Sequence, residues 1–571
     1  MKFTAFFSLL FTLLSINMSA NSRLVSVDYS QLTVVPYPQH IEPIKGTGFV
    51  LQNGVIISVA DSTHMLSADY LSDYIKRYYN IDCQIVNRSG KSSVKRGKKG
   101  VIYLSTGSLS RYKSPFTKEQ LAVEGSYYAN ISYGVVELKG ANEQGLFYAV
   151  QTLLQMLPGG QNGNVDHLDG VNVLLEIELP AVKVFDFPRF EYRGMHLDVV
   201  RHIYSVDYIK QYLDYIAMHK MNYFHWHLTD DQGWRMESKS HPLLNEIGSW
   251  RAGTIIGIFP GTGVDSTRYG GYYTIEQMKE IIDYAAKRYI TVVPEIDIPG
   301  HSMAILATYP HFSTTPDIPK QPAITWGIYN RQNNVLAPSE EVFSFLDDVF
   351  NELMDVFPGP YIHIGADECA KRWWKECEKT QQFIKEHNLE DENGLQRYFA
   401  ERVSETIHAR GRRFIGWDEM IDAGLVDGAI VMSWRNASNG VKAAKMGHKV
   451  IMTPSRYSYF NIAQRENEDS LCHNSRVVSL DSVYLFEPVP RGMDKELAKN
   501  IIGGQGCMWT EYFPHRERLE YGIFPRMSAI SEVYWTLPKN RDIVRFRSKL
   551  PQIFRKYDLW GANYYSGNLN D

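Results

Sequence analysis

Short apolar runs alternate with helix-like segments through residues 188–571. In the helix-like segments apolar residues recur at helical spacing, and Ser205 and Thr274 stand where a helix N-cap is expected. Eight βα alternations predict a (β/α)8 barrel with loop insertions, and a doubly wound sheet is the alternative. The runs with the length of buried strands are residues 192–199, 222–228, 290–296, 361–365, 413–417, 429–434, 448–452 and 502–509.

The part of the chain before the barrel has a different pattern. Residues 32–187 combine short β-like runs with helical segments, one of them at residues 142–157. Pro188 then interrupts the pattern. We therefore expect a smaller α+β domain over residues 32–187, followed by a barrel over residues 188–571 that ends in a helical segment.

The N-terminus has the pattern of a signal peptide. One lysine precedes an apolar stretch at residues 3–16, and small residues follow. The stretch is too short for a comfortable membrane span. We expect residues 1–21 to be removed and the protein to be exported, either to the periplasm or outside the cell, without stable membrane insertion.

Composition adds two constraints. The formal net charge is −4, which argues against a nucleic-acid partner. Tyrosine and tryptophan are abundant, at 36 and 11 residues, and suit a surface that stacks on sugar rings. The five cysteines are too scattered for a disulfide scaffold; Cys369 and Cys377 either pair or remain buried thiols.

Polar residues gather where the predicted strands end. The segments HWHLTDDQGWR, PEIDIPGH, HIGADE, GWDE, MSW and GCMWTEY all follow apolar runs. Catalytic groups of such barrels come from the C-terminal ends of several strands. These segments therefore predict one shared site at that end of the barrel.

Asp367 and Glu368 are adjacent carboxylates at the end of a predicted strand. They can reach one site only if the backbone turns, which Gly365 and Ala366 permit. Two converging carboxylates shift each other's pKa, so that one stays protonated and acts as an acid. This chemistry suits cleavage of a glycosidic bond. The alternative is a helix N-terminus stabilised by the acids.

The histidines admit two interpretations. His225, His227 and Asp230 have the residue types of metal ligands, but no second motif completes such a site. We favour histidines that support acidic groups by hydrogen bonds, with no metal or cofactor. His301 could hold or protonate a carboxylate of a neighbouring strand. Four tryptophans stand at or just beyond strand ends, and three of them could form the walls of a pocket for a sugar ring or an acetyl group. The four are Trp374, Trp417, Trp434 and Trp509.

The segments LDVVRHIYSVDYI, HWHLTDDQGWR, VVPEIDIPGHSMA, HIGADE, GWDEM and WTEY, in this order, resemble the β-N-acetylhexosaminidases of glycoside hydrolase family 20. The resemblance extends over roughly residues 188–540. It implies an exo-acting, retaining hydrolase that removes terminal β-linked GlcNAc or GalNAc from glycans. In this family the substrate assists catalysis, because its acetamido oxygen attacks the anomeric carbon.

The resemblance also implies roles for individual residues. Glu368 is the expected general acid/base, and Asp367 the residue that holds the acetamido N–H and stabilises the oxazolinium charge. Asp230 and His301 are similar to a supporting pair. The substrate-binding positions that it implies are Arg201, Trp417, Trp434, Tyr459, Asn461, Trp509 and Glu511.

Asn461 departs from the family pattern, in which an aspartate is common. Either the loop is shifted, since Tyr457 precedes Tyr459 by two residues, or a neutral amide has replaced a carboxylate. A neutral residue could admit a 6-sulfated sugar or simply bind the same hydroxyl. Two other functions stay open: a sugar-binding protein without turnover, and a glycosidase that uses two carboxylates.

Overall fold

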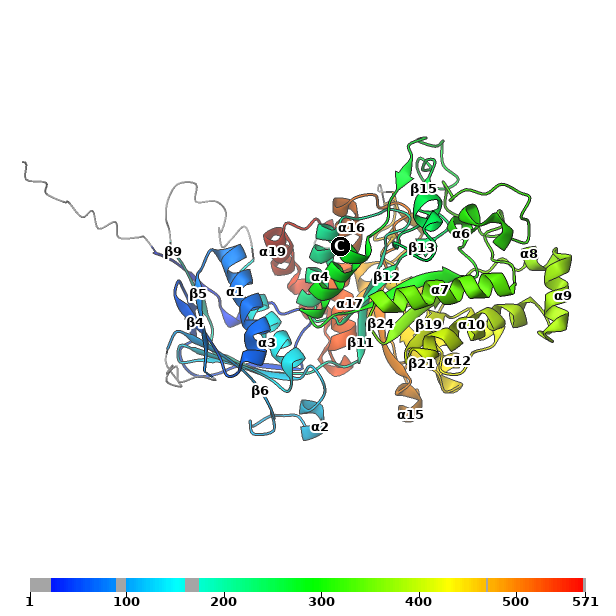
Figure 1. The fold of residues 1–571 in the computed structure, drawn as a ribbon. Helices are drawn as coiled ribbons and strands as arrows, with labels where there is room; N and C mark the ends of the chain where they lie inside the picture. The colour runs from blue at the N-terminus through cyan, green and yellow to red at the C-terminus, as the bar shows by residue number, and fades with distance from the viewer. Residues whose placement is uncertain (1–21, 89–98, 160–173, 469–470, 568–571) are drawn as a thin grey trace, which may run out of the picture.

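A computed structural model describes residues 22–88, 99–159, 174–468 and 471–567. The predicted signal peptide at residues 1–21 lies outside this range. Figure 1 shows two parts side by side. One part is a mixed sheet with helices, and the other is a barrel surrounded by helices.

Eight parallel strands form a closed barrel, which confirms the predicted fold. The first strand pairs with the last through Tyr192 and Gly503, so the sheet has no edge. The doubly wound alternative is therefore wrong. In spatial order the strands are β11 (Tyr192–Asp198), β12 (Tyr223–His227), β17 (Thr291–Ile298), β18 (Tyr361–Gly365), β19 (Arg413–Trp417), β20 (Ile430–Ser433), β21 (Lys449–Met452) and β24 (Ile501–Gly506).

Helices follow the barrel strands as the sequence predicts. Ser205 caps the first of them by accepting a hydrogen bond from the Tyr208 N–H, and Thr274 forms a capping box with Gln277. The longer helices are α4 (Val206–Met218), α5 (Ile275–Ala286), α7 (Glu340–Val356), α9 (Glu378–Glu386), α10 (Glu392–Ala409), α12 (Ala437–Lys445), α16 (Arg516–Ile523), α17 (Arg526–Trp535) and α19 (Leu550–Trp560). The shorter ones are α6 (Met303–Thr308), α8 (Arg372–Lys375), α11 (Met420–Ala423), α13 (Ser455–Ser458), α14 (Leu480–Leu485), α15 (Lys495–Ala498) and α18 (Ile543–Ser548).

The smaller part is built on a seven-stranded mixed sheet with a separate three-stranded sheet. Helix α3 (Glu143–Met156) packs on strands β7 and β8, and α1 (Met65–Tyr79) packs on α3; α2 (Lys118–Leu121) is short. The large sheet has the order β2 (His40–Pro43), β10 (Val182–Asp186), β7 (Tyr127–Ser132), β8 (Val135–Gly140), β6 (Val101–Thr106), β4 (Val55–Val59) and β5 (Cys83–Asn87). The small sheet contains β1 (Ser22–Ser26), β9 (Leu174–Leu179) and β3 (Phe49–Leu51).

A buried ion pair joins the two parts. Asp186, at the end of β10, accepts hydrogen bonds from the Lys220 ammonium, the Tyr127 hydroxyl and the Trp535 indole. Lys220 and Trp535 belong to the barrel, and both charged side chains are fully buried. Breaking such a pair is costly, so it fixes the small domain against the barrel.

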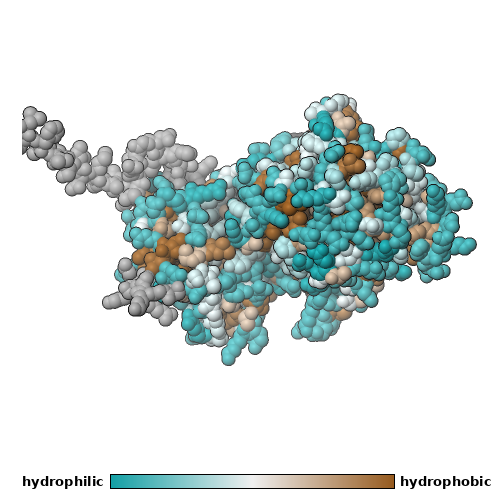
Figure 2. Space-filling model, viewed as in Figure 1, coloured by the Kyte–Doolittle hydropathy of each residue, from teal (hydrophilic) through white to brown (hydrophobic). Residues whose placement is uncertain are grey.

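Short strands and loops extend the C-terminal end of the barrel. They include three ribbons: β13 (Thr229–Asp230) with β14 (Gly233–Trp234), β15 (Trp250–Arg251) with β16 (Tyr269–Gly270), and β22 (Ile462–Ala463) with β23 (His473–Val477). The visible surface is mostly hydrophilic, with apolar groups scattered over it (Figure 2). Cys369 and Cys377 are both free thiols. Within the described residues, no helix has the length and apolar character to cross a membrane.

Candidate active site

A cavity of about 350 Å³ opens at the C-terminal end of the barrel strands. All of the predicted site residues line it except Trp417. Side chains from the loop insertions complete the wall, and most of these were not predicted. The lining comprises Arg201, Asp230, Asp231, Gln232, Asp297, His301, Trp326, Gly327, Ile328, Tyr329, Asp367, Glu368, Trp434, Tyr459, Asn461, Ile462, His473, Ser475, Arg476, Trp509 and Glu511.

The carboxylate pair enters the cavity on a turn with left-handed backbone. Gly365 and Ala366 have φ angles of 69° and 70°, and Glu368 has φ 38°. Such angles are unfavourable for residues with a side chain and cluster at functional sites. The helix that follows begins at Arg372, with Lys371 as its N-cap, so the helix N-terminus alternative for the acids is wrong.

Asp367 is the more buried member of the pair. Its side chain is 12% exposed, against 40% for Glu368, and its Oδ1 atom has no hydrogen-bond partner among the described residues. Burial, opposed by His301 and reinforced by Glu368, raises the pKa of Asp367 to about 6. The raised pKa that the sequence predicts for one carboxyl of the pair therefore lies on Asp367.

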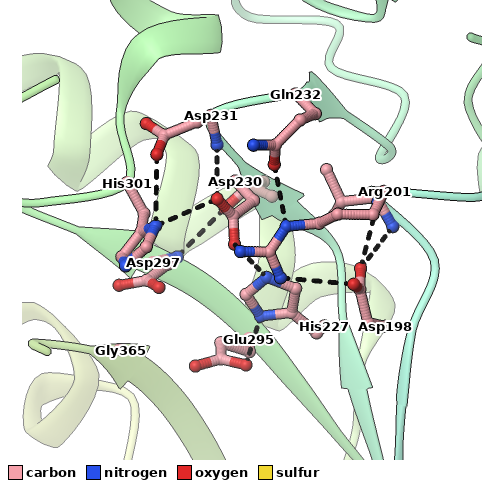
Figure 3. A network of polar contacts seen from close by, with 12 residues as sticks. Asp198, Arg201, His227, Asp230, Asp231, Gln232, Glu295, Asp297, His301 and Gly365 are labelled. Carbon is pink, nitrogen blue, oxygen red and sulfur yellow. Dashed lines mark hydrogen bonds and ion pairs between the residues drawn. The ribbon is translucent and has the colours of Figure 1, made fainter. Parts of the chain in front are cut away.

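His301 connects the pair to Asp230, and its contact with Asp230 is drawn in Figure 3. Its Nδ1 lies 3.0 Å from Asp230 Oδ1, and its Nε2 lies 3.4 Å from Glu368 Oε2 and 3.7 Å from Asp367 Oδ2. Burial disfavours the charged ring, but Asp230 and Asp231 outweigh it and raise the pKa of His301 well above its usual value. His301 is therefore an imidazolium that faces both acids.

Arg201 holds Asp230 from the other side (Figure 3). Its guanidinium lies 2.8 Å from Asp230 and 3.2 Å from Asp198, and its Nε donates to Gln232 Oε1 at 2.8 Å. Burial acts to raise the pKa of Asp230, but Arg201 and His301 hold it well below the usual range. Asp230 is thus a permanent anion that orients His301.

A second layer of paired groups lies beneath the cavity. Buried Glu295 lies within 3.2 Å of the His225, His227 and His363 rings and accepts a hydrogen bond from the Trp417 indole. Buried groups such as His225, Glu295 and His363 have atoms close enough to share a cation. The contacts of Glu295 with these two rings, and its hydrogen bond with His227, support the interpretation of the histidines as supports for acidic groups.

Aromatic rings form one wall of the cavity. Trp434 stacks on Tyr459 with ring centroids 5.9 Å apart, and Trp509 lies 6.3 Å from Tyr459. Trp417 is only 1% exposed and lies behind Trp509, 6.0 Å away, so it supports the wall rather than lining the cavity. Tyr457 stacks on Phe486 instead, which places Tyr459 at the predicted position. The fourth tryptophan, Trp374, is buried and stacks on Phe399.

Glu511 and Asn461 line the cavity next to strands β22 and β23. Burial acts to raise the pKa of Glu511, but His473, 3.5 Å away, and Arg201 lower it to about 2. Glu511 Oε2 and Asn461 Oδ1 have no hydrogen-bond partner within the described part of the chain. These acceptors suit the hydroxyl groups of a sugar.

The residues that sequence reasoning missed fall into two groups. Asp231, Gln232 and Asp297 lie inside polar segments that the sequence analysis singled out. Asp231 and Gln232 follow Asp230, and Asp297 lies at the end of a strand, so these positions could have identified them. Residues of the insertions had no signal in the sequence, because only the fold brings them to the cavity. They are Trp326, Gly327, Ile328, Tyr329, Ile462, His473, Ser475 and Arg476.

Comparison with solved structures finds matches that extend over almost the whole chain. The exo β-N-acetylglucosaminidase of Vibrio harveyi, solved with N-acetylglucosamine, aligns with a TM-score of 0.78 and 28% identity over 96% of this chain and 80% of that chain. The β-N-acetylhexosaminidase of Bacteroides fragilis aligns with a TM-score of 0.73 and 27% identity over 93% of this chain and 96% of that chain.

Sequence comparison gives the family. A β-hexosaminidase of Porphyromonas gingivalis is 40% identical over 75% of this chain and 53% of its own length, so the chain spans about half of that relative. One from Vibrio furnissii is 32% identical over 89% of this chain and 77% of its own length. The profile of glycosyl hydrolase family 20, domain 2, matches residues 31–184, and that of the catalytic domain matches residues 190–538. The chain therefore belongs to glycosyl hydrolase family 20, the family of the β-hexosaminidases.

Proposed function

We propose that the protein is an exo-acting β-N-acetylhexosaminidase that removes terminal β-linked GlcNAc or GalNAc with retention of configuration. One observation carries this proposal: buried Asp367 and more exposed Glu368 enter the same cavity in different environments. Adjacent acids in different environments suit two separate tasks in one reaction.

Asp367 is proposed to hold the acetamido group of the substrate. Its unpartnered Oδ1 accepts the N–H, and its charge stabilises the oxazolinium intermediate that forms when the acetamido oxygen attacks the anomeric carbon. The wall of Trp434, Tyr459 and Trp509 confines the acetamido methyl group, with Trp417 behind it.

Glu368 is proposed to give its proton to the leaving oxygen and then to activate water. Its side chain is 40% exposed in the cavity, so it can meet both the leaving oxygen of a bound sugar and water. His301 lies 3.4 Å from Glu368 and is anchored by Asp230, so it fixes the carboxyl in place. Arg201, Asn461 and Glu511 are proposed to bind the outer hydroxyls.

The two other functions receive less support. A two-carboxylate mechanism needs an enzyme nucleophile, but Asp230 and Asp297 are at most 2% exposed, and Asp230 is bonded to Arg201 and His301. A sugar-binding protein without turnover would need a gap in the acid machinery. In this structure Asp230, His301, Asp367 and Glu368 all reach one cavity.

We also propose that the protein is exported and acts on glycans outside the cytoplasm. The support is the sequence of residues 1–21, in which a lysine, an apolar stretch and small residues follow in the order of a signal peptide. N-terminal sequencing of the protein from a fractionated host would test the proposal. A protein that retains Met1 in the cytoplasmic fraction would contradict it.

A panel of aryl β-glycosides tests the activity. We expect hydrolysis of the GlcNAc and GalNAc glycosides and almost none of the glucoside, with the β-anomer as first product by NMR. A thiazoline that mimics the oxazolinium intermediate should inhibit the wild type strongly and Asp367→Asn much less. Equal rates on the glucoside would indicate an enzyme nucleophile instead.

A further inference from the structure

We propose that Glu295, a buried residue below the cavity, positions both halves of the reaction. Through His227 it holds Asp230, which anchors the histidine beside the proposed acid. Through Trp417 it holds the wall behind the proposed position of the acetamido group. Glu295 is fully buried and does not line the cavity, so this role differs from contact with the substrate. This inference rests on the proposed function and names a positioning residue for the same site.

The first contact of Glu295 leads toward the acid. His227 is its register partner on the adjacent strand β12, so the two side chains lie next to each other. Nδ1 of His227 is hydrogen-bonded to Glu295, and Nε2 lies 2.9 Å from Asp230 (Figure 3). Burial disfavours the charged ring, but Glu295 and Asp230 outweigh it and raise the pKa of His227 to about 10. His227 is therefore an imidazolium that donates one N–H to each acid.

Asp230 divides its two oxygens between different partners. Oδ2 lies 2.8 Å from Arg201 and 2.9 Å from His227, and Oδ1 lies 3.0 Å from His301. The two cations on Oδ2 fix the rotation of the carboxylate, and this rotation sets the direction of His301. Because His301 Nε2 lies 3.4 Å from Glu368, a turned carboxylate would displace the group beside the acid.

The second contact of Glu295 leads to the aromatic wall. Its Oε1 accepts a hydrogen bond from the Trp417 indole at 2.9 Å, whereas Oε2 takes the contact with His227. Trp417 is 1% exposed and lies 6.0 Å behind Trp509, which lines the cavity. Burial acts to raise the pKa of Glu295, but the histidine rings around it hold it well below the usual range. One anion therefore fixes a support of the wall and a support of the acid.

The test separates the two contacts with single variants. His227→Asn retains a donor toward Glu295 but none toward Asp230, and Trp417→Phe retains a ring without the N–H. His227→Asn should lower kcat for N,N′-diacetylchitobiose by about 10- to 100-fold, as for a charge-assisted hydrogen bond, and affect aryl glycosides with good leaving groups less. Trp417→Phe should raise the inhibition constant of the thiazoline by a similar factor. Each variant should leave the other measurement within about threefold.

Glu295→Leu removes both contacts and should show both effects. Glu295→Gln keeps one acceptor oxygen, which the indole N–H can use, so it should recover most of the thiazoline affinity. Glu532→Leu is the matched control, because Glu532 is a buried glutamate that bonds Tyr484 and Arg545 and does not line the cavity. It should change neither measurement, whatever its effect on the urea midpoint.

A folded Glu295→Leu that shows neither effect, or only one of them, would overturn this inference. NMR of the wild type with isotope-labelled histidine adds a measurement that does not depend on the folding of a glutamate variant. With His227 assigned from His227→Asn, we expect both of its ring nitrogens to be protonated at pH 8, below its pKa of about 10. A neutral ring would also overturn the inference. A wild type without hydrolysis and without thiazoline inhibition would contradict the proposed function instead.

Discussion

Two buried carboxylates, Asp186 and Asp230, show how similar networks serve different ends. Asp186 is fully buried between the domains and takes its hydrogen bonds from Lys220, Tyr127 and Trp535. Asp230 is equally buried, but its partners Arg201 and His301 line the cavity.

The two networks differ in the residues at which their contacts end. Around Asp186 the bonded residues end inside the core, so the network fixes the domain arrangement. From Asp230 the bonds pass through His301 to Glu368, a carboxyl that remains partly exposed in the cavity. Burial and charge alone therefore do not identify a functional site; a path from the buried charge to an exposed reactive group does.

Glu368→Gln should have the largest effect and should affect activity alone. A disaccharide has a poor leaving group that needs the proton, so kcat for N,N′-diacetylchitobiose should fall by about 10²- to 10⁴-fold. Aryl glycosides with good leaving groups should lose less in the first step. The urea midpoint should be unchanged, because the side chain is 40% exposed. Glu376→Gln, an exposed acid outside the cavity lining, serves as control. Near wild-type rates on both substrates would exclude Glu368 as the acid.

Asp186→Asn should do the reverse and affect stability alone. It leaves the Lys220 ammonium buried without its counter-charge, which typically costs about 3 to 5 kcal/mol. Urea unfolding measures this loss, and kcat/KM per folded molecule should stay within about threefold. The double variant Asp186→Asn with Lys220→Met should recover part of the stability, because it removes the unpaired charge. A loss of activity with unchanged stability would show that Asp186 is coupled to the site.

Asp367→Asn should stabilise the protein while it impairs catalysis. The folded-state pKa of Asp367 is about 6, above the ordinary value of 3.8. Its stabilising contribution is therefore complete below pH 4 and lost as the pH rises through 6. At pH 8 the ionised aspartate costs about 3 kcal/mol, which asparagine avoids. Urea unfolding of the wild type and of Asp367→Asn at pH 4 and pH 8 measures the difference between their free energies of unfolding. Equal values at pH 8 would contradict the cost of a buried, ionised Asp367.

The acid limb of the wild-type pH profile should report the same group. The proposed role needs ionised Asp367, which is protonated below its pKa of about 6. We expect kcat/KM to fall about tenfold per unit below pH 6, because kcat/KM reports groups of the free enzyme. The residual activity of Asp367→Asn should lack this limb. A limb that persists unchanged in the variant belongs to another residue.

The barrel was predictable because alternating apolar runs and helix caps are local signals. The strands that form match the predicted runs, and Ser205 and Thr274 cap helices as expected. The Asp186 pair was not predictable, because Lys220 and Trp535 meet it only through the tertiary fold.

The site also contains residues that could be predicted from the sequence and residues that could not. Asp230, His301, Asp367 and Glu368 follow strands, so the order of strands in a barrel brings them together. Arg476 comes from a ribbon whose path no periodicity predicts.

Gly365 shows that sensitivity to mutation need not mark contact with a substrate. A β-carbon at this position would lie 1.7 Å from Asp297 Oδ1, and the φ angle of 69° already disfavours other residues. In a saturation library selected for activity, glycine alone should survive at this position. Neighbouring Glu368 would look just as intolerant for a chemical reason. A map of tolerated substitutions would therefore not distinguish a position that the backbone requires from a position that the reaction requires. Measuring the stability of each inactive variant would distinguish the two.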